Sequence, residues 1–242
     1  MFGYPLDSSY SYRNYLRQPI VPVRRETTNN YSGSYRRPQT DPVTSNNFFK
    51  IVIVLDESGS MESVKNNMKD AINDLIKEQQ QVKGRPTTFT LVKFNDKVNR
   101  VIKNKPLEDI RLLTSDDYTP NGSTALYDCI GDTIEWFRNE KDVLLVIVTD
   151  GQENASRSFS KSEVLRMIEN KKKNDGWTYV YLSNDLQTAS QGDGIGCKRS
   201  SYASNVMLEQ HKFGDFMSSN LNSAISNFRR DGISVQRQLN SM

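Results

Sequence analysis

The stretch IVIVLDESGSM, residues 51–61, decides the fold class of this chain. A run of apolar, mostly β-branched residues leads straight into Asp56, and small polar residues follow at Ser58, Gly59 and Ser60. A continuous apolar run of this length is typical of a strand that is covered on both faces in a parallel sheet. The run DVLLVIVTD at 142–150 has the same character and predicts a second such strand.

Strands alternate with helices along the rest of the chain. Helical spacing of apolar residues predicts four helices, at 61–76, 125–137, 164–173 and near 209–230. Strand patterns lie at 87–96, 97–104 and 177–185. The short link between the first two predicts an antiparallel hairpin. The alternation predicts a doubly wound, Rossmann-like α/β domain with a mostly parallel sheet, one antiparallel edge strand and helices on both faces.

The segment 186–208 has little apolar pattern, although a last helix and an edge strand are expected there. Within it, CKRSSYA at 197–203 is the predicted sixth strand. The final predicted helix carries the single histidine, His211, which we expect on the surface rather than in a catalytic role.

The first 47 residues differ in composition from the rest. They hold five of the eight prolines, six of the eleven tyrosines and six arginines, with no apolar period. Such a composition buries too little surface to fold by itself, which predicts a flexible Tyr/Arg/Pro-rich N-terminal arm at 1–47 and one folded domain at 48–242. The alternative is an arm that orders on a partner, because Tyr and Arg often anchor interfaces.

Charge and cysteine content exclude several classes of protein. The arm accounts for the whole net charge of +3, so the domain is neutral and nucleic acid is not expected as a partner. Cys129 and Cys197 lack metal-ligand or redox spacing and are expected to be free thiols. Neither a membrane span nor a signal peptide is evident. We expect a cytoplasmic protein, or one carried within a larger assembly such as a virus particle.

Polar side chains follow three of the predicted segments where a ligand would bind. In a doubly wound sheet, ligands bind beyond the carboxyl ends of the strands. Asp56, Ser58 and Ser60 follow the first strand, Thr124 precedes the helix at 125–137, and Asp150 ends the strand at 142–150, so all five offer oxygen. Oxygen ligands without His or Cys suit Mg²⁺, with Mn²⁺ or Ca²⁺ as alternatives, and argue against zinc.

The set Asp56-x-Ser58-x-Ser60, Thr124 and Asp150 resembles the metal-ion-dependent adhesion site of the von Willebrand factor A domain. The resemblance covers roughly residues 48–230 and is sharp at those five positions. It implies three hydroxyl ligands, two carboxylates that often act through water, and an Asp or Glu from a protein partner that completes the coordination. The implied function is a metal-dependent protein-protein interaction module without enzymatic activity. TDGQEN at 149–154 also resembles family usage, which implies a rim role for Glu153 and Asn154.

Three other interpretations remain open. Ser58, Ser60 and Ser63 could simply cap a helix. A magnesium-dependent phosphohydrolase could use Asp56 as nucleophile, although Ser58 stands where the common phosphatase pattern has a second acid. A structural or assembly component could use the arm at 1–47 as a tether to neighbouring molecules.

Overall fold

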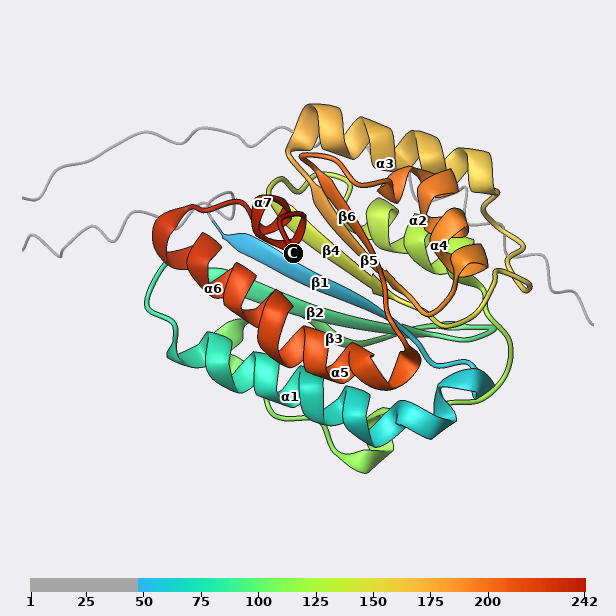
Figure 1. Cartoon of the computed structure of the whole chain (residues 1–242), viewed down its shortest axis with the longest axis horizontal. Coiled ribbons are helices and arrows are strands. Elements are labelled where there is room, and N and C mark those ends of the chain that lie inside the picture. Colours follow the sequence, from blue (N-terminus) through green and yellow to red (C-terminus); the bar gives the residue numbers. More distant parts are fainter. Residues whose placement is uncertain (1–47) are drawn as a thin grey trace, which may run out of the picture. The chain divides into compact units, whose positions relative to one another are not determined.

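The computed structural model describes residues 48–242, so the arm predicted at 1–47 lies outside the described residues. These residues form a six-stranded sheet with helices on both faces (Figure 1). The strands are β1 (Phe49–Asp56), β2 (Thr87–Phe94), β3 (Val98–Pro106), β4 (Val143–Val148), β5 (Thr178–Ser183) and β6 (Ala203–Met207). Their order is β3-β2-β1-β4-β5-β6, and only the β2–β3 pair is antiparallel. The predicted fold class, hairpin and antiparallel edge strand are confirmed.

Helices cover each face of the sheet. The α-helices are α1 (Lys65–Gln81), α2 (Leu126–Trp136), α3 (Lys161–Asp175), α4 (Leu186–Gly192), α5 (Phe213–Asp215), α6 (Asn222–Asp231) and α7 (Val235–Leu239). A 3₁₀ turn, η3 (Gly59–Val64), precedes α1, and π-helical turns follow α4 (η6, Asp193–Cys197) and α5 (η8, Phe216–Leu221). The short 3₁₀ turns η4 (Leu107–Asp109) and η5 (Ser115–Asp117) follow β3, and η7 (Gln210–Lys212) precedes α5. The helix predicted near 209–230 is therefore a run of consecutive helical turns.

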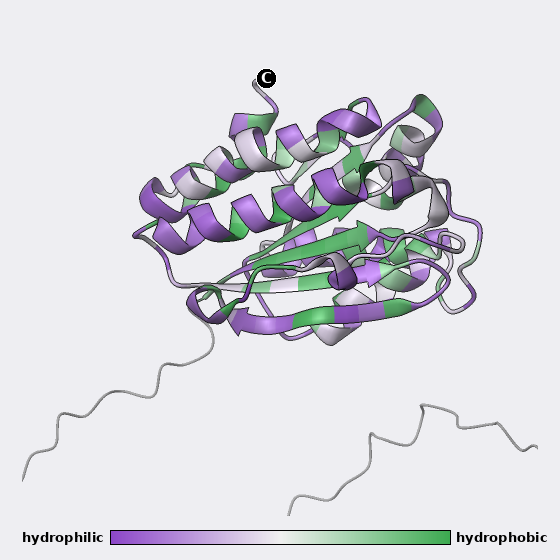
Figure 2. Cartoon of the chain, turned by 90° about the horizontal axis from the view of Figure 1, so that it is seen from below, coloured by the Kyte–Doolittle hydropathy of each residue, from purple (hydrophilic) through white to green (hydrophobic). Residues whose placement is uncertain are grey.

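The two faces of β1 carry separate apolar cores. Ile51, Ile53 and Leu55 pack with α1 and the C-terminal helices, whereas Val52 and Val54 pack with α2 and α3. Successive strand side chains point to opposite faces, so a strand covered on both sides needs apolar residues at every position. Figure 2 shows the resulting apolar strands between helices whose outer surfaces are polar.

The sixth strand is not where the sequence pattern placed it. β6 runs from Ala203 to Met207, whereas CKRSSYA at 197–203 ends a π-helical turn and forms a bend before the strand. The prediction was wrong because β6 is short and its side chains become more exposed toward its end, which leaves no apolar run to detect. Pairing with β5, from Tyr179–Ala203 to Ser183–Met207, defines it instead.

Both cysteines, Cys129 and Cys197, are buried free thiols, as predicted. Burial raises the pKa of each thiol, which keeps both protonated and unreactive at neutral pH. Among the residues that the structure describes, no helix is both long and apolar enough to cross a membrane.

Candidate functional site

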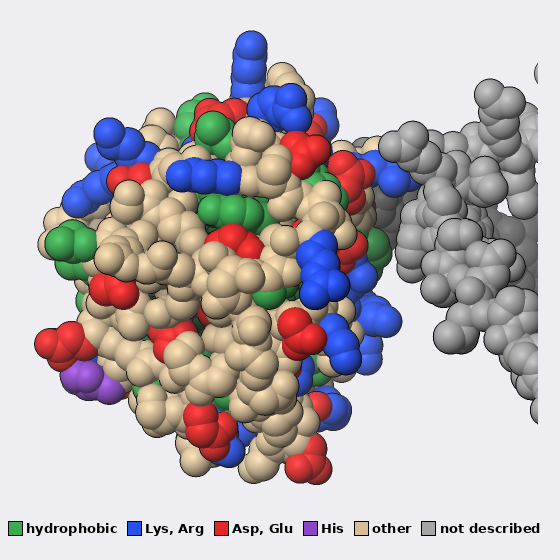
Figure 3. All heavy atoms as spheres, turned by 90° about the vertical axis from the view of Figure 1, so that its right-hand side faces the viewer, with side chains coloured by type: hydrophobic (Ala, Val, Ile, Leu, Met, Phe, Trp, Pro, Cys, Tyr) green, Lys and Arg blue, Asp and Glu red, His purple; other side chains and the backbone are tan. Residues whose placement is uncertain are grey.

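The loops that follow β1 and β4 lie side by side at the carboxyl edge of the sheet. The chain winds outward from β1 to β2 and β3 and then returns to β4 on the other side of β1, so the strand order reverses between β1 and β4, where such sheets bind ligands. Figure 3 turns this end of the domain toward the viewer and shows mostly backbone and side chains that are neither charged nor hydrophobic, with scattered acidic and basic side chains. All segments that carry the predicted ligands except the Thr124 loop leave directly from β1 or β4.

The β1 loop forms the first part of the site. Asp56 is fully buried, and its Oδ1 accepts a hydrogen bond from the backbone N–H of Ser58 at 2.7 Å. The hydroxyls of Ser58 and Ser60 lie 3.1 Å apart, which places these two side chains on the same side of the loop. Ser58 is buried, whereas Ser60 is exposed at the mouth.

Asp150 brings the β4 loop to the same place. Its Oδ1 accepts a hydrogen bond from Ser60 Oγ at 2.5 Å, although the two residues are 90 positions apart in the sequence. Asp56, Ser58, Ser60 and Asp150 are therefore connected through adjacent side chains, as the parallel strand order requires.

Thr124 reaches the site from the loop before α2. Its side chain is buried, and a Cβ atom built on Gly151 would lie 3.0 Å from its Oγ1 and 3.8 Å from Asp56 Oδ2. Asn154 fixes this loop, because its Oδ1 accepts from the Thr124 N–H at 2.9 Å and its own N–H donates to the Thr124 carbonyl at 3.0 Å. The structure thus brings all five predicted residues together.

Glu153 and Asn154 hold the loops rather than line the site. The Glu153 carboxylate accepts hydrogen bonds from the N–H of Tyr127, in the first turn of α2, and from Ala155 and Ser156. These contacts tie the β4 loop to the start of α2, so both residues support the site, and the rim role that the resemblance implies stays a prediction.

Burial controls the charge of the two carboxylates. It raises the pKa of Asp56 to about 6, while hydrogen bonds from Thr149 and Ser58 act in the opposite direction. Burial also raises the pKa of Asp150, which Ser60 partly offsets. In the described part of the chain, no Lys or Arg pairs with either carboxylate. The site is therefore electrostatically incomplete without an added positive charge.

A buried ion pair supports the site from below. Lys93 Nζ donates to Glu57 Oε1 at 2.6 Å, and this oxygen also accepts from the Thr119 N–H at 2.6 Å. Tyr118 donates its hydroxyl to the carbonyl of Asp56 at 2.7 Å. These contacts hold the segment before Thr124 against the end of β1, and they pair the buried Lys93 with Glu57.

Two site residues were missed by the sequence analysis. Thr149 donates from Oγ1 to Asp56 Oδ2 at 2.7 Å, and its position directly before Asp150 was a detectable signal. Gln210 donates from Nε2 to Asp150 Oδ2, and nothing in the sequence pattern indicated it. A contact from a segment 60 residues away can be found only in the tertiary structure.

The helix-capping interpretation does not describe Ser58. This residue precedes η3, but its side chain makes no capping hydrogen bond and instead faces Ser60. Gly59 is not in the left-handed region, and an added Cβ would meet only the Gly122 carbonyl at 3.8 Å. The backbone at this position therefore leaves room for a side chain.

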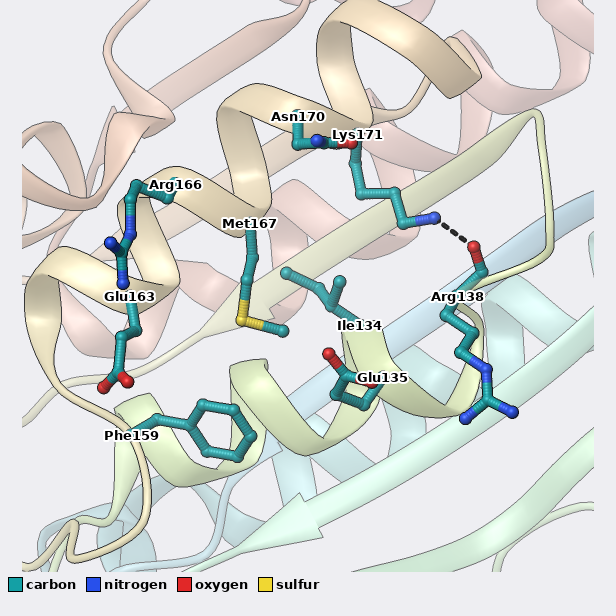
Figure 4. A pocket seen from close by; sticks show the side chains of 9 residues that line it. All are labelled: Ile134, Glu135, Arg138, Phe159, Glu163, Arg166, Met167, Asn170 and Lys171. Carbon is teal, nitrogen blue, oxygen red and sulfur yellow. Dashed lines mark hydrogen bonds between the residues drawn. The ribbon is translucent and has the colours of Figure 1, made fainter. Parts of the chain in front are cut away.

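Several surface grooves in the described part of the chain lie outside the five-residue site. One of about 740 Å³ adjoins it, with Gly122, Ser123 and Asn154 in its lining. Another of about 450 Å³ lies between α2 and α3, where Ile134, Phe159 and Met167 form an apolar floor between charged side chains (Figure 4). The first is lined by residues of the Thr124 loop, so a molecule bound at the site could extend into it.

The donor set fits a hard divalent cation. Three hydroxyl and two carboxylate side chains converge, all donors are oxygen, and the buried carboxylates lack a cationic partner in the described residues. Residues 48–242 contain no group of three or more His, Cys, Asp or Glu side chains able to hold a metal, so hydroxyls would have to complete the shell. Asp56 and Asp150 supply the negative charge that such an ion needs.

Comparisons with known proteins agree with this architecture. Residues 50–209, well over half of the chain, match the family model described as von Willebrand factor type A domain. A search of curated protein sequences gave no match.

Solved structures with a similar fold include a pilus adhesin, a minor pilin and a byssus thread matrix protein. The pilus adhesin SpaC from Lactobacillus rhamnosus GG has 12% identity over 77% of this chain and 31% of that chain, with a TM-score of 0.59. The PilB minor pilin from Streptococcus sanguinis has 14% identity over 78% and 64%, with a TM-score of 0.57. Proximal thread matrix protein 1 from the mussel byssus has 14% identity over 72% and 47%, with a TM-score of 0.51. This chain spans less than two thirds of each, and at these identities the likeness shows the fold alone.

Proposed function

The chain belongs to the von Willebrand factor type A domain family, and from that premise we propose that it binds a protein partner through a divalent cation held at the end of its sheet. Ser58, Ser60 and Thr124 would be the hydroxyl ligands, and Asp56 and Asp150 would hold the ion-bound water. The observation that carries the proposal is that three hydroxyl side chains converge on two buried carboxylates. Neither carboxylate has a cationic partner in the described residues. Mg²⁺ is the proposed ion, with Mn²⁺ and Ca²⁺ as alternatives.

The partner's contribution follows from charge. Neutral hydroxyls in direct contact offset less of a divalent ion's charge than carboxylates would, so the ion keeps its affinity for a further anionic oxygen. An Asp or Glu on the surface of a partner supplies one. Exposed Ser60 lies at the mouth, so the partner's carboxylate can approach the ion from solvent.

Catalysis is not part of the proposal. A phosphohydrolase with Asp56 as nucleophile would benefit from a free lysine beside the phosphate, and Lys93 is instead bound to Glu57 at 2.6 Å. A phosphate-release assay with a generic ester checks this. We expect wild-type protein and Asp56→Asn to show the same background level of phosphate release.

The proposal is tested by calorimetric titration of the full chain with Mg²⁺ and Mn²⁺. We expect saturable binding of both ions that Asp56→Ala abolishes. Asp74→Ala is the matched control, because Asp74 lies on the exposed face of α1 and pairs only with Lys77 among the described residues. Absence of binding by folded wild-type protein would falsify the metal site. Capture of a partner that EDTA releases, and that Asp56→Ala fails to capture, would support the bridging mechanism.

A further inference from the structure

Gln210 reaches the candidate site from the segment that follows β6. Its Nε2 donates to the carbonyl of Ser60 at 3.0 Å and to Oδ2 of Asp150. Its Oε1 accepts a hydrogen bond from Ser63 Oγ at 3.2 Å. One amide therefore connects the β1 loop, the β4 loop and the start of the C-terminal helices.

The backbone holds this amide in place from both sides. Leu208 donates its N–H to the carbonyl of Ser183 at 2.8 Å, which fixes the chain just before Gln210. Phe213, the first residue of α5, is fully buried in the core, which fixes the chain just after Gln210. Gln210 is only partly exposed, and the two backbone anchors on either side direct its side chain toward Asp150.

The contact determines how Asp150 is oriented. Ser60 donates to Oδ1 and Gln210 to Oδ2, so the two carboxylate oxygens are held by different segments and the carboxylate cannot rotate without breaking one bond. Groups that hydrogen-bond to metal ligands fix the orientation of those ligands, and their loss typically weakens metal binding about 10–100-fold.

We propose that Gln210 is a positioning residue of the metal site, which orients Asp150 and the Ser60 loop for the divalent cation. This inference rests on the proposed function. Gln210 lies just beyond the range 50–209 that matches the family model, so the match itself assigns it no role. A neutral donor suits this position, because a lysine there would place its own positive charge against Asp150 and compete with the ion.

The test is a calorimetric Mn²⁺ titration of the full chain, together with thermal unfolding of the metal-free protein. Gln210→Met keeps the side-chain length and removes the donor, and we expect Kd to rise about 10–100-fold with little change in Tm. Gln210→Lys should abolish saturable binding while raising the metal-free Tm, a combination that a purely structural role would not produce. Gln187→Met is the matched control, since Gln187 is exposed at the same end of the sheet and contacts Gln152 instead.

The outcomes separate the inference from the function on which it rests. If wild-type protein binds Mn²⁺ and the Kd of Gln210→Met is within about twofold of the wild-type value, or lower, the positioning role is overturned and the metal site stands. Wild-type protein that binds no Mn²⁺ overturns both. Gln210→Lys also decides the question if Gln210→Met fails to fold, because unchanged Mn²⁺ binding by that variant contradicts the inference.

Discussion

Thr149 at the end of β4 donates a hydrogen bond from its Oγ1 to Oδ2 of Asp56 at the end of β1, at 2.7 Å. The same hydroxyl contacts the carbonyl and the N–H of Gly151 at 3.1 and 3.2 Å. Two neighbouring strands are thus joined at their carboxyl ends by one side chain, and the buried carboxylate depends on it for one of its donors.

Replacing Thr149 by Val should therefore weaken both the fold and the site. Val has nearly the same shape but leaves Asp56 Oδ2 without this donor, which should cost about 1–3 kcal/mol of unfolding free energy. Urea unfolding measures the loss, and Thr149→Ser, which keeps the hydroxyl, should recover most of it. A Val variant as stable as wild type, or a Ser variant that loses more stability than the Val variant, would show that the hydrogen bond is not what matters.

The metal-free protein should become less stable as pH rises through the titration of Asp56. Its pKa in the folded state is about 6, above the ordinary value of 3.8, so the folded protein binds the proton more tightly than the unfolded chain. The unfolding free energy is therefore unaffected below about pH 4, falls between about pH 4 and 6, and then levels off about 3 kcal/mol lower.

Urea unfolding in EDTA from about pH 4 to 8 checks this dependence. Asp56→Asn should remove most of the fall, so that the variant is the more stable protein near neutral pH. Any slope that it retains is expected from Asp150, whose pKa is also raised by burial. Parallel profiles for wild type and Asp56→Asn would contradict the prediction.

Gly151 leaves the space in which the Thr124 hydroxyl lies. An alanine Cβ would approach Thr124 Oγ1 to 3.0 Å, which is too close unless the hydroxyl moves. Gly151→Ala should therefore raise the Kd for Mn²⁺ roughly tenfold, the lower end of what a displaced ligand costs, at a stability cost of about 1 kcal/mol. Calorimetry measures the affinity.

Gly59→Ala is the control for this prediction. Gly59 lies in the neighbouring β1 loop, where an added Cβ would meet the Gly122 carbonyl at an ordinary 3.8 Å. Its Kd should match that of wild type. If both alanine variants bind Mn²⁺ with the wild-type Kd, the prediction is wrong, because displacing the Thr124 hydroxyl would then have no effect on metal binding.

Removal of one partner of the buried pair Lys93–Glu57 should strongly destabilise the folded protein. The exposed fractions of their side chains are 7% and 9%, and Lys93→Met leaves the Glu57 charge buried without its cation. We expect a loss of about 3–5 kcal/mol in urea unfolding. The double variant Lys93→Met/Glu57→Gln should recover much of it, because the glutamine amide keeps an acceptor for the Thr119 N–H without a buried charge. A loss below about 1 kcal/mol, as for exposed pairs, would contradict the buried role.

The sequence by itself determined the fold class and the five candidate side chains that meet at the carboxyl end of the sheet. The apolar run before Asp56 requires cover on both faces, and the alternation with helices then defines a doubly wound sheet. Because the carboxyl ends of parallel strands share one edge, the polar residues after β1 and β4 had to meet there, and the structure confirms that Ser60 and Asp150 are in contact.

The tertiary structure alone decided what holds these residues in place. β6 carries too few apolar residues to be found by pattern, and its position depends on hydrogen bonds to β5. Gln210 reaches the site from a segment whose local sequence favours no particular side-chain direction, and strand alternation places Lys93 on one face of β2 without indicating its partner Glu57. Local pattern determines which elements form, whereas contacts between distant segments depend on how those elements pack, and packing is a property of the whole domain.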